Sequence, residues 1–144
     1  MQADLEKAKS LLIEDRTCVL VRGDEQLISK ETGIKPMLGF IDSGKDLSNF
    51  SVADKIVGKA ASMLFVLAKI KAVYAQVISE SGYLFLKQNG VYIEYQTKTE
   101  KIINRAKTGV CPMEEATQNC NDPKEALVLI KNKLAYLQSL HQKK

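Results

Sequence analysis

Histidine is nearly missing from this chain, and cysteine is scarce. The only histidine, His141, lies in a tail that ends Gln142-Lys143-Lys144, and we expect it to be frayed and solvated. Catalysis by histidine is therefore almost excluded. The cysteines are odd in number and irregularly spaced, which argues against a disulfide framework or a thiolate-rich metal site, so we expect reduced thiols: Cys18, Cys111 and Cys120.

Long apolar runs and a strong charge of one sign are also missing. Residues 1–6 are acidic and contain no long apolar run, which predicts neither a secretory signal nor a membrane anchor, so the protein is expected to be cytoplasmic. The net charge is only +4, and the lysines are interleaved with Asp and Glu. The composition as a whole therefore gives little support for nucleic-acid binding.

What remains is an ordinary globular composition. The chain has 144 residues, of which 45% are apolar and 26% charged, and no linker is evident. This predicts a single domain over residues 1–144 with a frayed basic tail at about 138–144. We predict no metal and no cofactor, and the oligomeric state is left open, a homo-oligomer included.

The stretch 51–61 is expected to organise the fold. Ser51 and Asp54 form a capping-box-like pair, which predicts a helix that begins at Ser51 and runs to about Lys71. Gly58 would lie inside this helix, where the close approach of a strand or ligand would explain it. Apolar residues recur at spacings of three and four and predict a buried helix: Ile56, Val57, Ala60, Ala61, Leu64, Leu67 and Ala68.

Residues 72–79 follow as a run of β-branched and aromatic residues, which predicts an interior strand and hence an α/β sandwich. In such folds ligands bind beyond the carboxyl ends of strands and near helix N-termini. We therefore expect residues 79–81 and 51–55 to face one pocket.

Other elements follow from local patterns. Residues 81–96 allow either a hairpin around Asn89-Gly90 or a helix at 81–88 followed by one strand parallel to its predecessor. The remaining predictions are a helix at 3–13, strands at 17–21 and 26–29 joined by a tight turn, helices at 36–43 and 99–107, and a final helix that starts at Asp122-Pro123. Cys18 is most simply a small apolar core residue.

Cys111 is the candidate for reactive chemistry. The order Cys111-Pro112-Met113-Glu114 is typical of a helix start, with the cysteine at the cap and the glutamate at the third helical position. Backbone donors there stabilise a thiolate, Arg105 or Lys107 would add to this, and Glu114 would oppose it. The alternative is that Cys111 packs and Glu114 completes a cap.

Asp54 and Lys55 also have two interpretations. Asp54 either caps the helix with Ser51 or belongs to a site, and Lys55 is either solvated or a ligand contact. Together with Cys111 they would provide acid, base and nucleophile, provided that the fold brings them together.

Two motifs carry a family resemblance. Residues 52–61, read with Asn104-Arg105 and residues 108–114, resemble the DUF1893 family of uncharacterised prokaryotic proteins with a cytidine deaminase-like fold. The resemblance covers roughly residues 4–136. It implies a three-layer α/β sandwich with a mixed sheet of four or five strands, helices on both faces, and a helix at 81–88.

The chain departs from the enzymatic deaminases of that fold. They need a metal ligand and a glutamate at one helix start and a Pro-Cys-x-x-Cys pair at the next. This chain has Asp54-Lys55 and residues 79–82, Ser-Glu-Ser-Gly, without histidine or cysteine at either place. Zinc-dependent deamination is therefore disfavoured.

The sequence leads to one main hypothesis and one alternative. The first is an enzyme without zinc that acts on a small-molecule or nucleotide-like substrate, with Cys111 as nucleophile or redox thiol and Asp54 or Glu114 as acid or base. Its substrate contacts would be Lys55, Asn104 and Arg105. The alternative is a ligand-binding or regulatory module without turnover.

Overall fold

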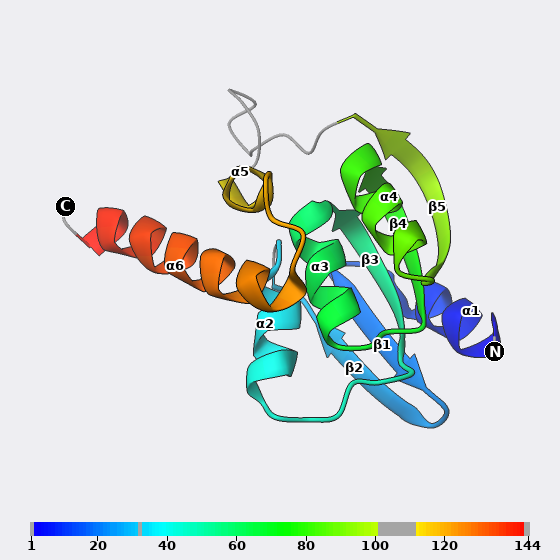
Figure 1. Cartoon of the computed structure of the whole chain (residues 1–144). Coiled ribbons are helices and arrows are strands. Elements are labelled where there is room, and N and C mark those ends of the chain that lie inside the picture. Colours follow the sequence, from blue (N-terminus) through cyan, green and yellow to red (C-terminus); the bar gives the residue numbers. More distant parts are fainter. Residues whose placement is uncertain (1, 32, 101–111, 143–144) are drawn as a thin grey trace.

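A computed structural model describes residues 2–31, 33–100 and 112–142 (Figure 1). Its elements, in chain order, are α1 (Gln2–Leu11), β1 (Cys18–Arg22), β2 (Glu25–Ser29), α2 (Lys35–Asp42), β3 (Ser51–Val57), α3 (Lys59–Leu67), β4 (Ala72–Ser79), α4 (Glu80–Gln88), β5 (Tyr92–Thr99), α5 (Pro112–Thr117) and α6 (Pro123–Gln142).

The five strands form one mixed sheet in the order β2-β1-β3-β4-β5. β1 pairs antiparallel with both β2 and β3, whereas β3, β4 and β5 run parallel to one another. The parallel strands are joined by α3 and α4, as parallel crossovers require. Their carboxyl ends therefore lie at one edge of the sheet, next to the starts of those two helices.

The architecture has three layers, as predicted. α1 covers one face of the sheet and contacts β1, β3 and β4, while α3 and α4 cover the other face (Figure 1). α2, α5 and α6 pack against α3 on the same side. This arrangement confirms the mixed sheet of four or five strands with helices on both faces.

The predicted helix at 51–71 is wrong in its first part. Residues 51–57 form β3, the central strand, between β1 and β4. Ser51 therefore caps no helix, and its buried hydroxyl has no hydrogen-bond partner among the described residues. The apolar spacing misled because Val52, Ile56 and Val57 also suit a buried strand, where sheet pairing on both sides outweighs local helix preference.

Gly58 lies at the N-cap of α3 and not inside a helix. Its backbone is extended, with φ −105° and ψ −170°, and α3 runs only from Lys59 to Leu67. Lys69 has φ +62°, and the chain leaves the helix there to enter β4 at Ala72. The predicted strand at 72–79 is confirmed.

The ambiguous region 81–96 adopts the helix-and-strand alternative. α4 ends at Asn89-Gly90, where Gly90 has φ +74° and Val91 N–H donates to the carbonyl of Leu86 at 3.1 Å. This is the glycine-terminated helix end that leaves the chain free to start β5. The hairpin interpretation is therefore wrong.

Most other local predictions are confirmed. The 17–21 and 26–29 hairpin appears as β1 and β2, and α2 lies at the predicted place. Pro123 is the first residue of α6, and the Asp122 carboxylate accepts from Lys124 N–H at 3.0 Å. α6 stays helical through Gln142, within the tail expected to fray from about 138. The predicted helix at 99–107 lies, apart from its first two residues, outside the described part of the chain; Thr99 ends β5.

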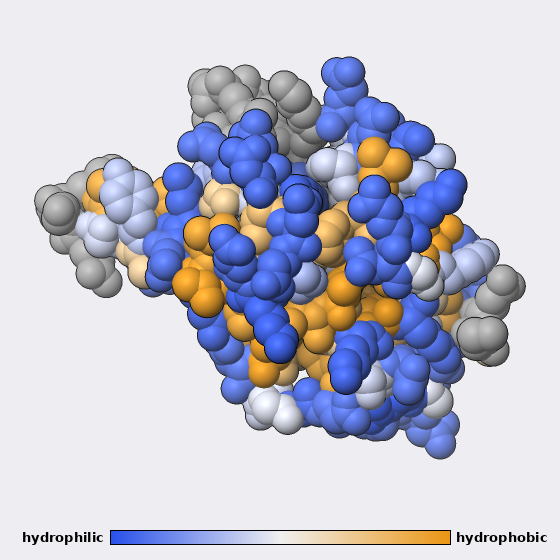
Figure 2. Space-filling view, viewed as in Figure 1, coloured by the Kyte–Doolittle hydropathy of each residue, from blue (hydrophilic) through white to orange (hydrophobic). Residues whose placement is uncertain are grey.

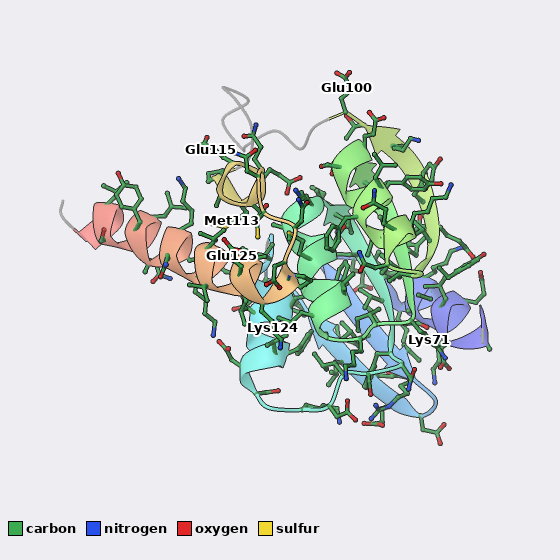
Figure 3. All side chains as sticks on the ribbon, in the orientation of Figure 1. Lys71, Glu100, Met113, Glu115, Lys124 and Glu125 are labelled. Atoms are coloured by element: carbon green, nitrogen blue, oxygen red, sulfur yellow. The ribbon has the colours of Figure 1, made fainter. Side chains whose placement is uncertain are left out.

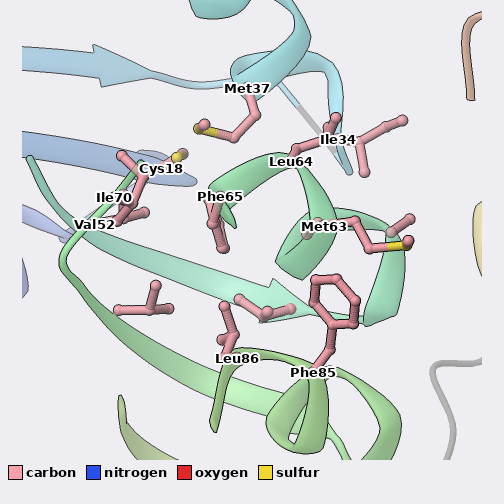
Figure 4. Close-up of a cluster of buried hydrophobic side chains, with 14 of the residues drawn as sticks. Cys18, Ile34, Met37, Val52, Met63, Leu64, Phe65, Ile70, Phe85 and Leu86 are labelled. Atoms are coloured by element: carbon pink, nitrogen blue, oxygen red, sulfur yellow. The ribbon is translucent and has the colours of Figure 1, made fainter. Parts of the chain in front are cut away.

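The main core lies between the sheet and the α2, α3 and α4 layer (Figure 4). Phe65, Met63 and Leu64 of α3 meet Met37 of α2 and Leu86 of α4 there. Figure 2 shows apolar residues in the centre of this side and a hydrophilic rim. Among the described residues, no helix combines the length and apolar character needed to cross a membrane.

Candidate functional site

Asp54 lies in the middle of β3 and is only 5% exposed. In the sheet register it is opposite Cys18 of β1 and Ala75 of β4. β3 continues for three more residues to Val57, so Asp54 lies about 10 Å back from the carboxyl end of the strand. The sequence pattern placed Asp54 at a helix start, whereas the structure places it inside the sheet.

Burial controls the ionisation of Asp54. Desolvation raises its pKa from the ordinary 3.8 to about 7, although hydrogen bonds from the Lys55 and Ile56 backbone act in the opposite direction. Cys18 is completely buried, and its pKa is raised by burial first and by the Asp54 charge second. Cys18 is therefore a core residue, as the sequence predicted, and its thiol resists ionisation.

Lys55 is directed away from Asp54. Successive residues of a strand alternate between the two faces of the sheet. The Lys55 ammonium group donates to the carbonyl oxygen of Glu14 at 3.1 Å, just beyond α1. The structure therefore does not bring Asp54 and Lys55 together in one pocket.

The start of α4 is built around Ser79, the last residue of β4. Ser79 is 1% exposed, and its hydroxyl oxygen accepts from Gly82 N–H at 3.0 Å, which caps the helix. Ser81 Oγ lies 3.3 Å from Ser79 Oγ. Residues 79–81 do lie at a helix start at the carboxyl edge of the sheet. Their neighbour across this edge is Gly58, not the predicted 51–55.

Glu114 caps a helix other than its own. Its Oε1 accepts a hydrogen bond from Lys59 N–H at 2.8 Å, and its Oε2 accepts one from Ala60 N–H at 3.0 Å. Ser79 Oγ donates to Oε1 at a longer 3.5 Å. Glu114 thus completes a cap, as one interpretation of the sequence held, but on α3 and from α5. A carboxylate is favoured there because free backbone donors and the positive end of the helix dipole both attract it.

Two glycines make room for this contact. A Cβ atom at Gly58 would lie 2.3 Å from Glu114 Oε1, closer than any real contact. A Cβ atom at Gly82 would lie 2.9 Å from the Gly58 carbonyl carbon and 2.9 Å from Ser62 Oγ. The missing side chain at Gly82 therefore lets the starts of α3 and α4 touch, and the missing side chain at Gly58 lets Glu114 of α5 reach the start of α3. A close approach at Gly58 and a place for Ser79 near the pocket were both predicted from the sequence, whereas the role of Gly82 was not.

Lys59 of α3 makes a reciprocal contact with the end of α5. Its ammonium group donates to the carbonyl oxygen of Gln118 at 3.1 Å, just after the last residue of α5. The two helices therefore exchange caps, with a carboxylate at the start of α3 and an ammonium group at the end of α5. Met113 adds a buried side chain on the inner side of α5 (Figure 3). These contacts fix α5 against α3.

The other predicted site residues are not described. Asn104, Arg105 and Cys111, together with Lys107, lie within 101–111, outside the described residues. α5 begins at Pro112, so the predicted helix start there is confirmed. Among the described residues, no three His, Cys, Asp or Glu side chains are grouped as a metal site requires.

A separate hollow lies at the far end of α3. It is open and shallow, with a volume of about 280 Å³. Its lining comes from α2, the loop after it and the end of α3: Ile41, Gly44, Lys45, Asp46, Leu47, Leu67, Ala68 and Lys69. Of the predicted site residues that the structure describes, Asp54, Lys55 and Glu114, none lines this hollow, so we assign it no part in the candidate site.

The candidate site is therefore the corner where α3, α4 and α5 meet at the carboxyl edge of β3 and β4. Two backbone N–H groups and the Ser79 hydroxyl donate to one carboxylate there, while the Lys59 ammonium group bonds to the Gln118 carbonyl oxygen. Such a set of donors recognises acidic groups. In this chain Glu114 supplies the acidic group itself.

Comparison with known proteins identifies the relatives of this chain. A family model described as TM1506, a domain of unknown function (DUF1893), matches residues 6–134. The fold is similar to the crystal structure of a DUF1893 family protein, TM1506, from Thermotoga maritima. The TM-score is 0.84 at 24% sequence identity, over 92% of this chain and 91% of that chain. No curated protein matches the chain.

Proposed function

This chain belongs to the DUF1893 family of domains of unknown function, and we propose that it is a deaminase-fold enzyme without zinc chemistry. Its substrate is a small or nucleotide-like molecule, bound at the carboxyl edge of β3 and β4. Cys111 is its reactive group, acting as nucleophile or redox thiol. Asn104 and Arg105 contact the anionic part of the substrate.

One observation carries this proposal: Glu114 is held by the first turn of α3. Glu114 belongs to α5, and Cys111 immediately precedes the first residue of α5 in the sequence. The contact therefore anchors the start of α5 at the edge of the sheet where ligands bind in α/β folds. A thiol at a helix start beside basic residues is the type that ionises readily.

Glu114 has an anchoring role in this proposal. Both of its oxygens accept backbone hydrogen bonds, so neither oxygen is free to act as an acid or base toward a substrate. The α3 N-terminus also offsets its negative charge, which reduces its opposition to a thiolate at Cys111. Asp54 has a pKa of about 7, but it is buried inside the sheet about 10 Å from this edge, so it does not reach a substrate bound there.

Zinc has no place in the proposed chemistry. The corrected helix starts are residues 58–61, Gly-Lys-Ala-Ala, and residues 79–82, Ser-Glu-Ser-Gly. Neither stretch supplies the histidine or cysteine ligands of a zinc deaminase. The proposed site residues, Cys111, Asn104 and Arg105, suit chemistry at a thiol better than activation of a metal-bound water.

The test compares wild-type protein with Cys111→Ala in a pooled metabolite extract, followed by mass spectrometry over time. We expect a metabolite to disappear with the wild-type protein and to persist with Cys111→Ala. Cys120→Ala is the matched control, because Cys120 is 6% exposed and its thiol donates to the Asp122 carbonyl oxygen at 3.3 Å. Turnover by Cys111→Ala at the wild-type rate would overturn the proposal.

The alternative function is a ligand-binding module without turnover. The engaged Glu114 carboxylate and the buried Asp54 favour it, because neither group faces solvent freely at the candidate site. Native mass spectrometry of the purified protein distinguishes the two. A co-purified molecule that stays chemically unchanged on prolonged incubation supports the module, and time-dependent conversion supports the enzyme.

A further inference from the structure

A cluster of tyrosine and lysine side chains lies where α4 meets β5, away from the candidate site contacts. The rings of Tyr83 and Tyr95 meet edge to face, with centroids 5.7 Å apart and planes at 85°. Lys98 lies 4.7 Å from the centroid of the Tyr83 ring, and Lys87 lies 5.8 Å from it. Two cations therefore flank one aromatic ring, and a second ring lies beside it.

The cluster is accessible. Tyr95 is 42% exposed, and Lys87 and Lys98 are both exposed. Leu84, one residue after Tyr83 on α4, is 47% exposed. β5 is the edge strand of the sheet among the described residues, on the side away from β2 (Figure 1). A flexible ligand can therefore reach the Tyr95 ring and both lysines, whereas Tyr83 is half-buried against the core.

The positive charge of the cluster is available for a ligand. Lys9 and Lys71, near the other end of the same strands, are each neutralised by a carboxylate, at 3.0 Å and 3.4 Å. Neither Lys87 nor Lys98 forms an ion pair within the described part of the chain. Their contacts are with the Tyr83 ring, which an approaching phosphate does not have to break.

An exposed aromatic ring beside cations that have no ion pair among the described residues is a combination that binds single-stranded nucleic acid. Bases stack on the rings, phosphates meet the cations, and neither contact depends strongly on sequence. An anionic membrane would use the lysines alone, and a protein partner would need a broader apolar surface. The mild net charge of the whole chain does not oppose this, because the effect is local.

We propose that the cluster formed by Tyr83, Lys87, Tyr95 and Lys98, the tyrosine–lysine cluster, is a binding surface for single-stranded nucleic acid. This inference goes beyond the proposed function and does not depend on Cys111. It gives the chain a second, separate surface, for a ligand that carries both bases and phosphates.

The test is fluorescence anisotropy with a labelled single-stranded oligo-uridine of about 12 nucleotides, within the usual site size of such surfaces. We expect binding that weakens as salt is raised. Lys87→Glu/Lys98→Glu should weaken it about tenfold or more. The charge-matched control is Lys124→Glu/Lys133→Glu on α6, where Lys133 lies 5.8 Å from the Tyr136 ring without a second cation. It should change the affinity by no more than about twofold.

Stacking is tested separately from charge. Tyr95→Ala should weaken binding about tenfold, the usual cost of one lost base-stacking contact, whereas Tyr136→Ala on α6 should leave it unchanged. Circular dichroism confirms that each variant is folded, and the lysine variants keep the test decisive if Tyr95→Ala unfolds. Equal loss with both lysine pairs would overturn the proposal. So would full binding by folded Tyr95→Ala, or preferential binding to phosphatidylserine vesicles.

Discussion

A Cβ atom at Gly58 would lie 2.3 Å from Oε1 of Glu114, 56 positions later in the sequence. The carboxylate thus occupies the space that any other residue at position 58 would need. It also satisfies the N–H groups of Lys59 and Ala60 that the glycine itself cannot cap. The identity of residue 58 and the attachment of α5 to α3 therefore depend on each other.

Gly58→Ala tests this dependence. The added methyl group would push the carboxylate away from the start of α3, so the cap should be lost and the protein destabilised by ~1–2 kcal/mol. Urea unfolding gives the measurement. The matched control is Gly39→Ala in α2, where a Cβ atom would meet nothing within 4 Å. That variant should be unchanged or up to ~1 kcal/mol more stable, since alanine favours helix. Equal effects at the two glycines would contradict the account.

Glu114→Gln tests the carboxylate itself. Glutamine has nearly the same shape but only one acceptor oxygen and no charge, so one backbone N–H of α3 loses its partner. We expect a loss of ~1–2 kcal/mol in the free energy of unfolding. Glu115→Gln, the next residue on α5 and exposed to solvent, is the control and should change it by less than ~0.5 kcal/mol. If the two substitutions cost the same, Glu114 has no special role.

Asp54 should make stability depend on pH. Its pKa in the folded protein, about 7, lies above the ordinary 3.8, so the folded state binds more protons between these values. The contribution of Asp54 to stability is then greatest below about pH 4, falls as pH rises to about 7, and is level above that. A difference of about three in pKa corresponds to ~4 kcal/mol.

Asp54→Asn removes this proton equilibrium. We expect the variant to be more stable than wild type at pH 8 and to lose most of the difference in urea midpoint between pH 5 and pH 8. Urea unfolding midpoints of the variant and the wild type, each measured at pH 5 and at pH 8, test this expectation. Parallel pH profiles for the two proteins would mean that Asp54 is not the group responsible.

Sequence reasoning succeeded where local signals suffice. The glycine turn of the first hairpin, the Asp122-Pro123 helix start and the β-branched run at 72–79 each specify one structure within a few residues. At 81–96 local signals allowed two structures. The family resemblance favoured the helix, whose end is fixed by the positive φ of Gly90.

The failures were long-range in origin. Residues 51–57 carry a helix-like spacing, but pairing with β1 and β4, set by distant parts of the chain, makes them a strand. The predicted position of Asp54 at a helix start was wrong for the same reason. The hydrogen bonds from Lys59 and Ala60 of α3 to Glu114 span 55 and 54 positions of the sequence, and no local pattern indicates such a contact. The only signal was Gly58, which indicated close approach without naming the partner.

The measurement that tests the central claim most directly is the pH dependence of Cys111 alkylation, followed by peptide mass spectrometry. Cys18 and Cys120, at 0% and 6% exposure, are internal controls that should stay almost unreacted in the folded protein. We predict a midpoint for Cys111 well below the ~8.5 of a free thiol, shifted in Glu114→Gln but not in Glu115→Gln. A midpoint at or above ~8.5 in the wild-type protein would contradict a reactive thiol at this site.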